Sequence, residues 1–186
     1  MNTVLRIHLV GLAGALAALV HAATPSPYAG QQSRDIKALS SAEQADLLAG
    51  KGMGLAKAAE LNGYPGPAHV LELATDLALT AEQRARTQAL WQSMDTRAKA
   101  VGQQVIDAER ELDALFLSKQ VTRERLTAQL DRIGALQAQL RAVHLEAHLE
   151  QVRILTPEQA SRYAALRGYS APAGAQHGGH GGQHKH

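Results

Sequence analysis

Leu79-Thr80-Ala81-Glu82-Gln83 recurs, shifted by 76 residues, as Leu155-Thr156-Pro157-Glu158-Gln159. Each copy is a capping box: the Thr hydroxyl accepts a hydrogen bond from the backbone N–H of the Gln, and the Gln side chain reaches back to the Thr N–H. Pro157 strengthens the second copy, because a proline at the first helical position loses no hydrogen bond. The sequence therefore predicts two helix starts with the same cap, formed by Thr80 and Gln83 and by Thr156 and Gln159.

The stretch between the two boxes has helical periodicity with one interruption. Its first half carries apolar residues at spacings of three and four, namely Leu90, Met94, Ala98, Val101, Val105, Ala108, Leu112 and Leu115. The pattern stops near residues 118–120, and Thr122 is a candidate cap for a second helix. That helix repeats the spacing at Leu126, Leu130, Ile133, Leu140, Val143 and Ala147, with Gln137 as a polar interruption. Neither helix can bury its stripe alone, so we expect an antiparallel hairpin.

Short helices are expected on both sides of this hairpin. A third capping box at Ser40 predicts a helix that ends near Gly50, residues 55–61 suit two helical turns, and residues 62–67 are a helix breaker. Residues 68–77 predict another short helix, and a last helix over residues 157–166 is ended by Gly168. The glycines of residues 50–54 do not form a phosphate loop, since no strand precedes them and no Gly-Lys-Ser/Thr follows. The predicted fold is all-α, with Trp91 and Phe116 as core residues.

The N-terminal residues and the composition indicate an exported protein. Residues 1–22 combine Arg6 with an apolar run over residues 9–20, which is short for a membrane span, and small residues suit cleavage after Ala22. An uncleaved N-terminal anchor is the alternative. The chain has no cysteine, so any metal site must use His, Met, Asp or Glu. Its 19 basic and 17 acidic residues predict a mixed surface rather than a nucleic-acid interface.

The C-terminal tail, residues 169–186, is rich in Gly and His and lacks apolar periodicity, which predicts disorder. Glycines let neighbouring imidazoles converge on one ion, and such a tract is typical of metal binding. Imidazole ligands suit divalent zinc, copper or nickel. An inert polar tail and a cloning tag are the alternatives. The candidate ligands in this tail are His177, His180, His184 and His186.

Three further histidines are candidate metal ligands inside the helical region. His144 and His148 are four residues apart, which places both on one face of a helix, a spacing that zinc sites use. The catalytic His-Glu-x-x-His form is absent, because residue 145 is Leu. His69 reaches the same level of the bundle if the helix over residues 68–77 folds back along the hairpin, and Glu72 can add a carboxylate. The alternative places one of the paired histidines at the edge of the apolar seam and the other in solvent.

Two such boxes that frame a hairpin behind an export signal resemble the Spy/CpxP (LTxxQ-motif) family, which includes the ZraP- and CnrX-type heavy-metal resistance and sensor proteins. The resemblance covers residues 68–168 and leaves residues 23–67 as an N-terminal arm. It implies a four-helix hooked hairpin that dimerises into a cradle. It also implies metal sites built from His and carboxylates, with Met53 or Met94 as a possible thioether ligand. The cysteine that ZraP-type tails carry is absent here.

These observations predict a periplasmic protein that binds divalent metal and responds to metal or envelope stress. The alternative is an ATP-independent chaperone with an incidental His-rich tail, and a third possibility is an inert structural protein. No nucleophile–base pair or paired carboxylates are recognisable, so we do not expect an enzyme. The expected partners are a second copy of the chain and either unfolded periplasmic proteins or a membrane-bound sensor or anti-sigma protein. No nucleic-acid partner is expected.

Overall fold

The computed structural model describes residues 26–169 of the 186-residue chain. The chain divides into two units, Met1–Gln32 and Ser33–His186. The described part of the first unit consists of turns that lead into the short 3-10 helix η1 (Gln31–Ser33). The predicted export signal at residues 1–22 lies outside the described residues, as do the predicted tail ligands His177, His180, His184 and His186. The export signal and the metal ligands of the tail stay predictions.

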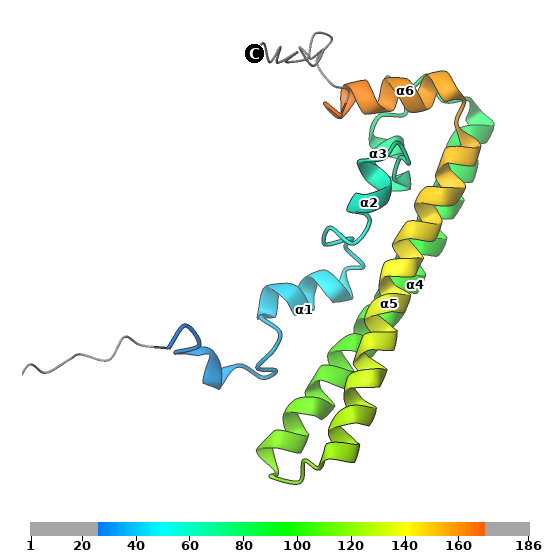
Figure 1. Cartoon of the computed structure of the whole chain (residues 1–186). Coiled ribbons are helices and arrows are strands. Elements are labelled where there is room, and N and C mark those ends of the chain that lie inside the picture. Colours follow the sequence, from blue (N-terminus) through cyan, green and yellow to red (C-terminus); the bar gives the residue numbers. More distant parts are fainter. Residues whose placement is uncertain (1–25, 170–186) are drawn as a thin grey trace, which may run out of the picture. The chain divides into compact units, whose positions relative to one another are not determined.

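The second unit is built from six α-helices (Figure 1), which confirms the predicted all-α class for the described residues. The helices are α1 (Ser41–Leu48), α2 (Lys57–Glu60), α3 (Pro67–Glu72), α4 (Ala81–Leu117), α5 (Arg123–Ile154) and α6 (Pro157–Leu166). Helices α4 and α5 form the long antiparallel hairpin, α1–α3 lie along it, and α6 turns away at the open end of the hairpin. Within residues 26–169, no helix is long and apolar enough to cross a membrane.

All three predicted capping boxes are present, and the glutamines of the two boxes that frame the hairpin also bind each other. Thr80 and Thr156 are the N-caps of α4 and α6, with the reciprocal bonds to Gln83 and Gln159 in place. The Gln83 Nε2 donates to Gln159 Oε1 at 2.8 Å, and the Gln159 Nε2 donates back to Gln83 Oε1 at 3.0 Å. Gln83 Nε2 also donates to the backbone carbonyl of Ile154, and Gln159 Nε2 donates to that of Leu77. The two motifs therefore form one hydrogen-bond network across the open end of the hairpin.

The apolar seam lies where the periodicity predicts, with two corrections near the hairpin tip. Ala98, Val101, Val105 and Ala108 of α4 are buried against Ile133, Leu136, Leu140 and Val143 of α5. The predicted core residue Phe116 is 50% exposed and the predicted seam residue Leu130 is 49% exposed. Both lie where the two helices run beyond the short helices, so no third element covers them. The expectation that Phe116 belongs to the core was therefore wrong, whereas Trp91 is half-buried.

Helix α3 is shorter than predicted, and the turns that follow it carry part of the core. It ends at Glu72 rather than near residue 77, and the chain then turns through Ala78, whose φ is +49°. This turn buries Leu77 beside Val70, Leu155 and Tyr163. Packing at the open end of the hairpin has overridden the local helical preference of residues 73–77.

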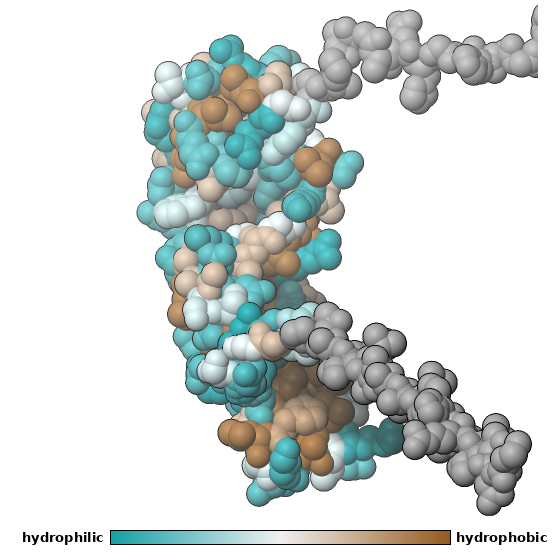
Figure 2. Space-filling view, turned by 90° about the vertical axis from the view of Figure 1, so that its left-hand side faces the viewer, coloured by the Kyte–Doolittle hydropathy of each residue, from teal (hydrophilic) through white to brown (hydrophobic). Residues whose placement is uncertain are grey.

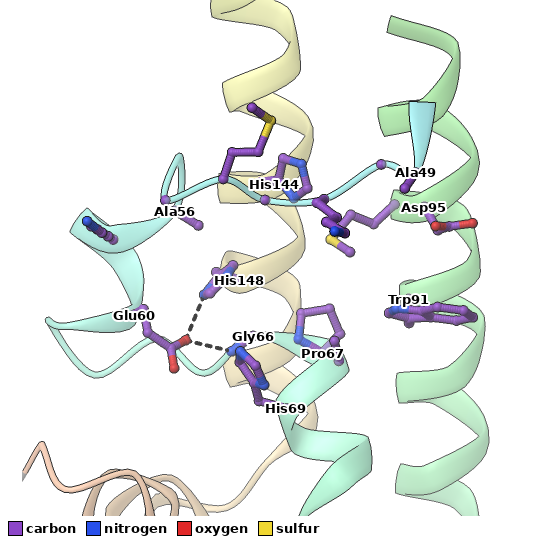
Figure 3. A pocket seen from close by; sticks show the side chains of 18 residues that line it. Ala49, Ala56, Glu60, Gly66, Pro67, His69, Trp91, Asp95, His144 and His148 are labelled. Carbon is purple, nitrogen blue, oxygen red and sulfur yellow. Dashed lines mark hydrogen bonds and ion pairs between the residues drawn. The ribbon is translucent and has the colours of Figure 1, made fainter. Parts of the chain in front are cut away.

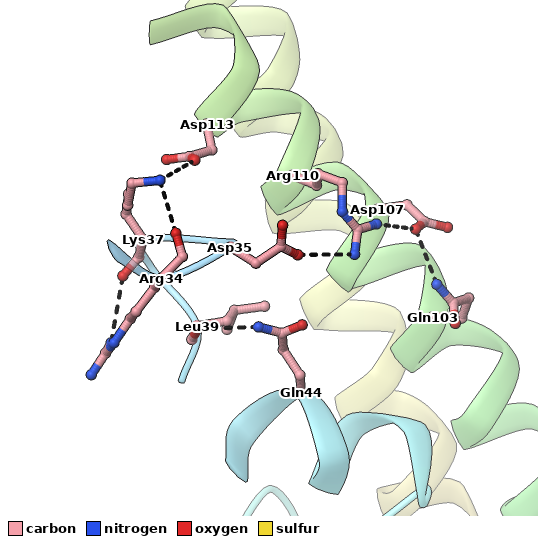
Figure 4. Close-up of polar contacts among 9 residues, drawn as sticks. All are labelled: Arg34, Asp35, Lys37, Leu39, Gln44, Gln103, Asp107, Arg110 and Asp113. Atoms are coloured by element: carbon pink, nitrogen blue, oxygen red, sulfur yellow. Dashed lines mark hydrogen bonds and ion pairs between the residues drawn. The ribbon is translucent and has the colours of Figure 1, made fainter. Parts of the chain in front are cut away.

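The segment before α1 is held on α4 by one buried side chain and an ion-paired rim. Ile36 is fully buried in the main core. Around it, Lys37 pairs with Asp113 at 3.1 Å, and Asp35 lies 3.7 Å from Arg110 (Figure 4). Exposed pairs of this kind contribute little each, so the burial of Ile36 is the main anchor.

Candidate metal pocket beside the hairpin

A pocket of about 460 Å³ opens between the hairpin and the short helices (Figure 3). Helix α5 contributes two neighbouring imidazoles, α4 contributes an indole, a thioether and a carboxylate, and the loop from α1 to α2 closes one side. The side chains with chemistry of interest are Met53, Glu60, His69, Trp91, Met94, Asp95, His144 and His148. All three histidines predicted as metal ligands inside the helical region therefore line one pocket.

His144 presents a nitrogen atom that has no hydrogen-bond partner. The side chain is buried, with a residue exposure of 3%, and its Nε2 is a buried atom without a partner. Burial lowers the pKa of His144 below its usual value, and the neighbouring His148 lowers it further. The ring is therefore neutral at pH 7. An unpaired polar atom inside a protein carries a free-energy penalty, and a bound ligand would remove that penalty.

His148 is oriented by a backbone carbonyl. Its Nδ1 lies 2.7 Å from the carbonyl oxygen of Tyr64, and because a carbonyl only accepts, Nδ1 must donate. The proton is thereby fixed on Nδ1, so the neutral ring keeps its lone pair on Nε2, which is how metal-binding histidines are commonly oriented. His148 is also buried, so the alternative of one histidine at the seam edge and one in solvent is wrong.

Gly66 is required where the chain passes His148. A Cβ atom at this position would lie 2.9 Å from Cε1 and 3.0 Å from Nε2 of His148, closer than real Cβ atoms approach. Any other residue at position 66 must therefore displace the imidazole. The sequence showed Gly66 only as part of a helix breaker, and nothing local indicated that it faces a histidine on α5.

The carboxylate of Glu60 joins this pocket to helix α6. Its Oε1 accepts a hydrogen bond of 2.5 Å from the Tyr163 hydroxyl, and its Oε2 accepts from the Gly66 N–H at 3.2 Å and lies 3.6 Å from His148 Nδ1. Burial, and then the hydrogen bond to Glu60, raise the pKa of Tyr163 above its usual range, so the hydroxyl stays protonated and donates. Arg167 lies 3.7 Å from Oε1. Sequence reasoning missed Glu60, because Tyr163 lies 103 residues away along the chain.

His69 is placed differently from the other two histidines. It is partly exposed on α3, and its Nδ1 pairs with Glu72 Oε2 at 2.8 Å. The carboxylate of Glu72 thus binds His69 and does not line the pocket. Among residues 26–169, no three His, Asp or Glu side chains come together as a metal-binding group. The site predicted from His69, His144 and His148 shares one pocket, but its coordination stays a prediction.

The donor chemistry of the pocket nevertheless suits a metal ion. His144 supplies a buried nitrogen without a partner, and His148 supplies an imidazole whose tautomer is fixed. The two thioethers that the family resemblance suggested, those of Met53 and Met94, both line the same pocket. These donors are uncharged, and none of them requires a cysteine.

Within residues 26–169 the protein is an all-α hairpin with a pocket lined by histidines and methionines. Residues 55–162, more than half of the chain, match the family described as heavy-metal resistance, and the chain belongs to this family. The family is part of the Spy/CpxP-like group. The match starts earlier than the predicted limit at residue 68 and so takes in Glu60 and Gly66. No curated protein and no solved structure matches the chain.

Proposed function

We propose that this protein is an exported metal-binding protein that takes up zinc, copper or nickel in the pocket beside the hairpin. The observation that supports this most directly is the buried, unpartnered Nε2 of His144 beside His148, in a chain of the heavy-metal resistance family. When bound, the ion supplies a strong acceptor for imidazole lone pairs. The tail histidines, His177 to His186, then act as a second and weaker collector of the same ions.

The chain's own residues prepare the pocket for this role. The Tyr64 carbonyl holds the His148 proton on Nδ1, and burial keeps His144 neutral, so both rings offer a lone pair at neutral pH. Because both side chains are buried, little rotamer freedom remains to be lost on binding. Two imidazoles do not fill the coordination positions of the bound ion, so other pocket donors or water occupy the rest.

Calorimetric titration of the full chain tests this function. All four tail histidines are first replaced by alanine, which gives the tail-silent variant. We expect it to bind one equivalent of metal tightly, His144→Ala in that background to abolish the binding, and His148→Ala to weaken it. His69→Ala is the matched comparison, because it removes a pocket histidine that is already paired with Glu72. If the tail-silent variant binds no ion, or binding survives loss of both α5 histidines, the pocket function is wrong.

A chaperone role is the second candidate, and one feature favours it. Large apolar side chains are exposed near the hairpin tip, with Leu117 78%, Phe116 50% and Leu130 49% exposed. Figure 2 shows apolar side chains gathered at the lower end of the view, the end of the hairpin tip. Exposed apolar patches mark interaction sites. A holdase predicts suppression of client aggregation without metal, and loss of that activity in Phe116→Ser/Leu117→Ser.

Location and partners complete the proposal. We expect the chain to accumulate in the periplasm after removal of residues 1–22, to form a homodimer, and to signal to a membrane-bound sensor or anti-sigma protein or to shield unfolded proteins. Cell fractionation with N-terminal sequencing tests the export. Sedimentation of the purified chain with and without metal tests the dimer.

A further inference from the structure

We propose that the preferred ion of this pocket is a soft monovalent cation, Cu⁺ or its analogue Ag⁺, held by His144 together with the thioethers of Met53 and Met94. This inference rests on the proposed function, because it names which ion the pocket takes. Four observations carry it: the engagement of the oxygen donors, the placement of the methionines, the backbone at Met53 and the charge of the lining.

The oxygen donors of the pocket are already engaged. Glu60 accepts hydrogen bonds from Tyr163 and from the Gly66 N–H, and Asp95 pairs with Lys99 at 2.7 Å. Zinc sites are commonly four-coordinate with nitrogen, oxygen or thiolate ligands, and within residues 26–169 no three His, Asp or Glu side chains assemble to provide them. The pocket therefore offers fewer suitable ligands to a small divalent ion than to a soft monovalent ion.

The sulfur donors of the described chain are concentrated here. The protein has three methionines, and both of those within residues 26–169 line this pocket, one from the α1–α2 loop and one from α4. Thioethers are soft ligands that select Cu⁺ among the ions of the first transition row. His144 lines the same pocket and adds an imidazole ligand.

Met53 has a backbone conformation that favours glycine, and the residue is 46% exposed where it lines the pocket. Met53 has a φ of +46°, which lies in the left-handed region that glycine adopts without strain and other residues adopt at a cost. Its two neighbours, Gly52 and Gly54, are glycines, so the loop accepts glycine readily. A methionine in the strained position, lining the pocket, is explained if its sulfur binds a ligand.

The charge of the lining also favours a single positive charge. Lys51 and Lys57 line the pocket together with Glu60 and Asp95, so the formal charges of the lining balance. The proposed ligands, one imidazole and two thioethers, are neutral. The cost of removing an ion from water rises with the square of its charge, so a neutral pocket accepts a monovalent ion more readily than a divalent one.

Trp91 provides a direct readout, because it is the only tryptophan of the chain and lines the pocket. The tail-silent variant is titrated with Ag⁺, with Cu⁺ under anaerobic conditions against a competing chelator, and with Zn²⁺. We expect one equivalent of Ag⁺ or Cu⁺ to quench Trp91, with Cu⁺ bound at least 100-fold more tightly than Zn²⁺. Met53→Leu/Met94→Leu, which conserves side-chain volume, should reduce the ratio of Cu⁺ to Zn²⁺ affinity at least 100-fold.

A composition-matched variant controls for thioethers outside the pocket. It adds Leu112→Met and Leu115→Met, on α4 away from the pocket, to the double leucine variant, and should not recover Cu⁺ binding. X-ray absorption at the copper edge should show sulfur neighbours in the tail-silent variant that both leucine variants lack. If Zn²⁺ is preferred, or the double leucine variant retains the preference for Cu⁺, the inference fails while the metal pocket stands. If no ion binds to the tail-silent variant, the proposed function itself fails.

Discussion

The two ends of the hairpin are built in contrasting ways. At the open end, the helices meet through partly buried polar groups. Gln83 of α4 binds Gln159 of α6, and Glu60 of α2 binds Tyr163 of α6. Toward the tip, α4 and α5 meet mainly through apolar side chains. The Gln129 Nε2 of α5 donates to the Ala108 carbonyl of α4 at 2.6 Å, and the Arg132–Glu111 pair lies on the surface. The pocket with the histidines belongs to the open end.

The contrast separates the apolar contacts that stabilise the hairpin from the polar contacts that fix the positions of the short helices. Apolar seams tolerate exchange of one aliphatic side chain for another, whereas a buried polar network fails when one member leaves its partners unsatisfied. We therefore expect substitutions at the open end to affect stability and metal binding together. Polar substitutions at the tip should have small effects on stability.

The largest expected effect is at the paired capping boxes. Gln83→Ala removes the bonds of this side chain to the Thr80 N–H, to the Ile154 carbonyl and to Gln159. The half-buried Gln159 amide then lacks one of its partners. We expect the free energy of unfolding to fall by about 2–3 kcal/mol, the sum of a lost cap and an unsatisfied polar group. Arg132→Ala at the tip should cost less than about 1 kcal/mol. Urea unfolding of both variants measures the difference, and equal losses would remove the distinction between the two ends.

Substitution of two glycines within the long helices should change stability by intermediate amounts and in opposite directions. A Cβ on Gly102 of α4 would lie 2.4 Å from the Leu47 carbonyl oxygen, so Gly102→Ala must displace α1, at a cost of about 1–3 kcal/mol. A Cβ on Gly134 of α5 meets nothing within 4 Å. Gly134→Ala should therefore stabilise the protein by about 0.5–1 kcal/mol through better helix propensity. The midpoint of thermal unfolding should therefore fall in Gly102→Ala and rise in Gly134→Ala. A shift in the same direction in both variants would contradict the close packing of α1 against α4.

The smallest effect concerns pH. Burial holds the pKa of His144 below its usual value of 6.5, so the unfolded chain binds a proton before the folded chain does. The contribution of the neutral ring to stability is complete above pH 6.5 and is lost as the pH falls through the lowered pKa. Stability measured from pH 7.5 to 5 should therefore fall less steeply in His144→Gln than in the wild type. Equal slopes in the two proteins would contradict this contribution of His144.

Local sequence signals predict the two long helices and α6, but only part of the pocket and not the end of α3. The caps at Thr80, Thr122 and Thr156 and the seam of α4 and α5 were predicted, because capping and periodicity involve residues a few positions apart. His144 and His148 were found by their spacing. Phe116 was misplaced, because periodicity does not show where a helix runs past its neighbours.

The sequence by itself determined that this chain is an all-α protein with a capped helical hairpin and with histidines on one face of its second long helix. Only the tertiary structure decided that the Tyr64 carbonyl orients His148, that Glu60 binds Tyr163 of α6, and that the two glutamines of the capping boxes bind each other. The physical reason is separation along the chain. These contacts join residues 76 to 103 positions apart, and only packing of the short helices against the hairpin brings them within hydrogen-bond distance.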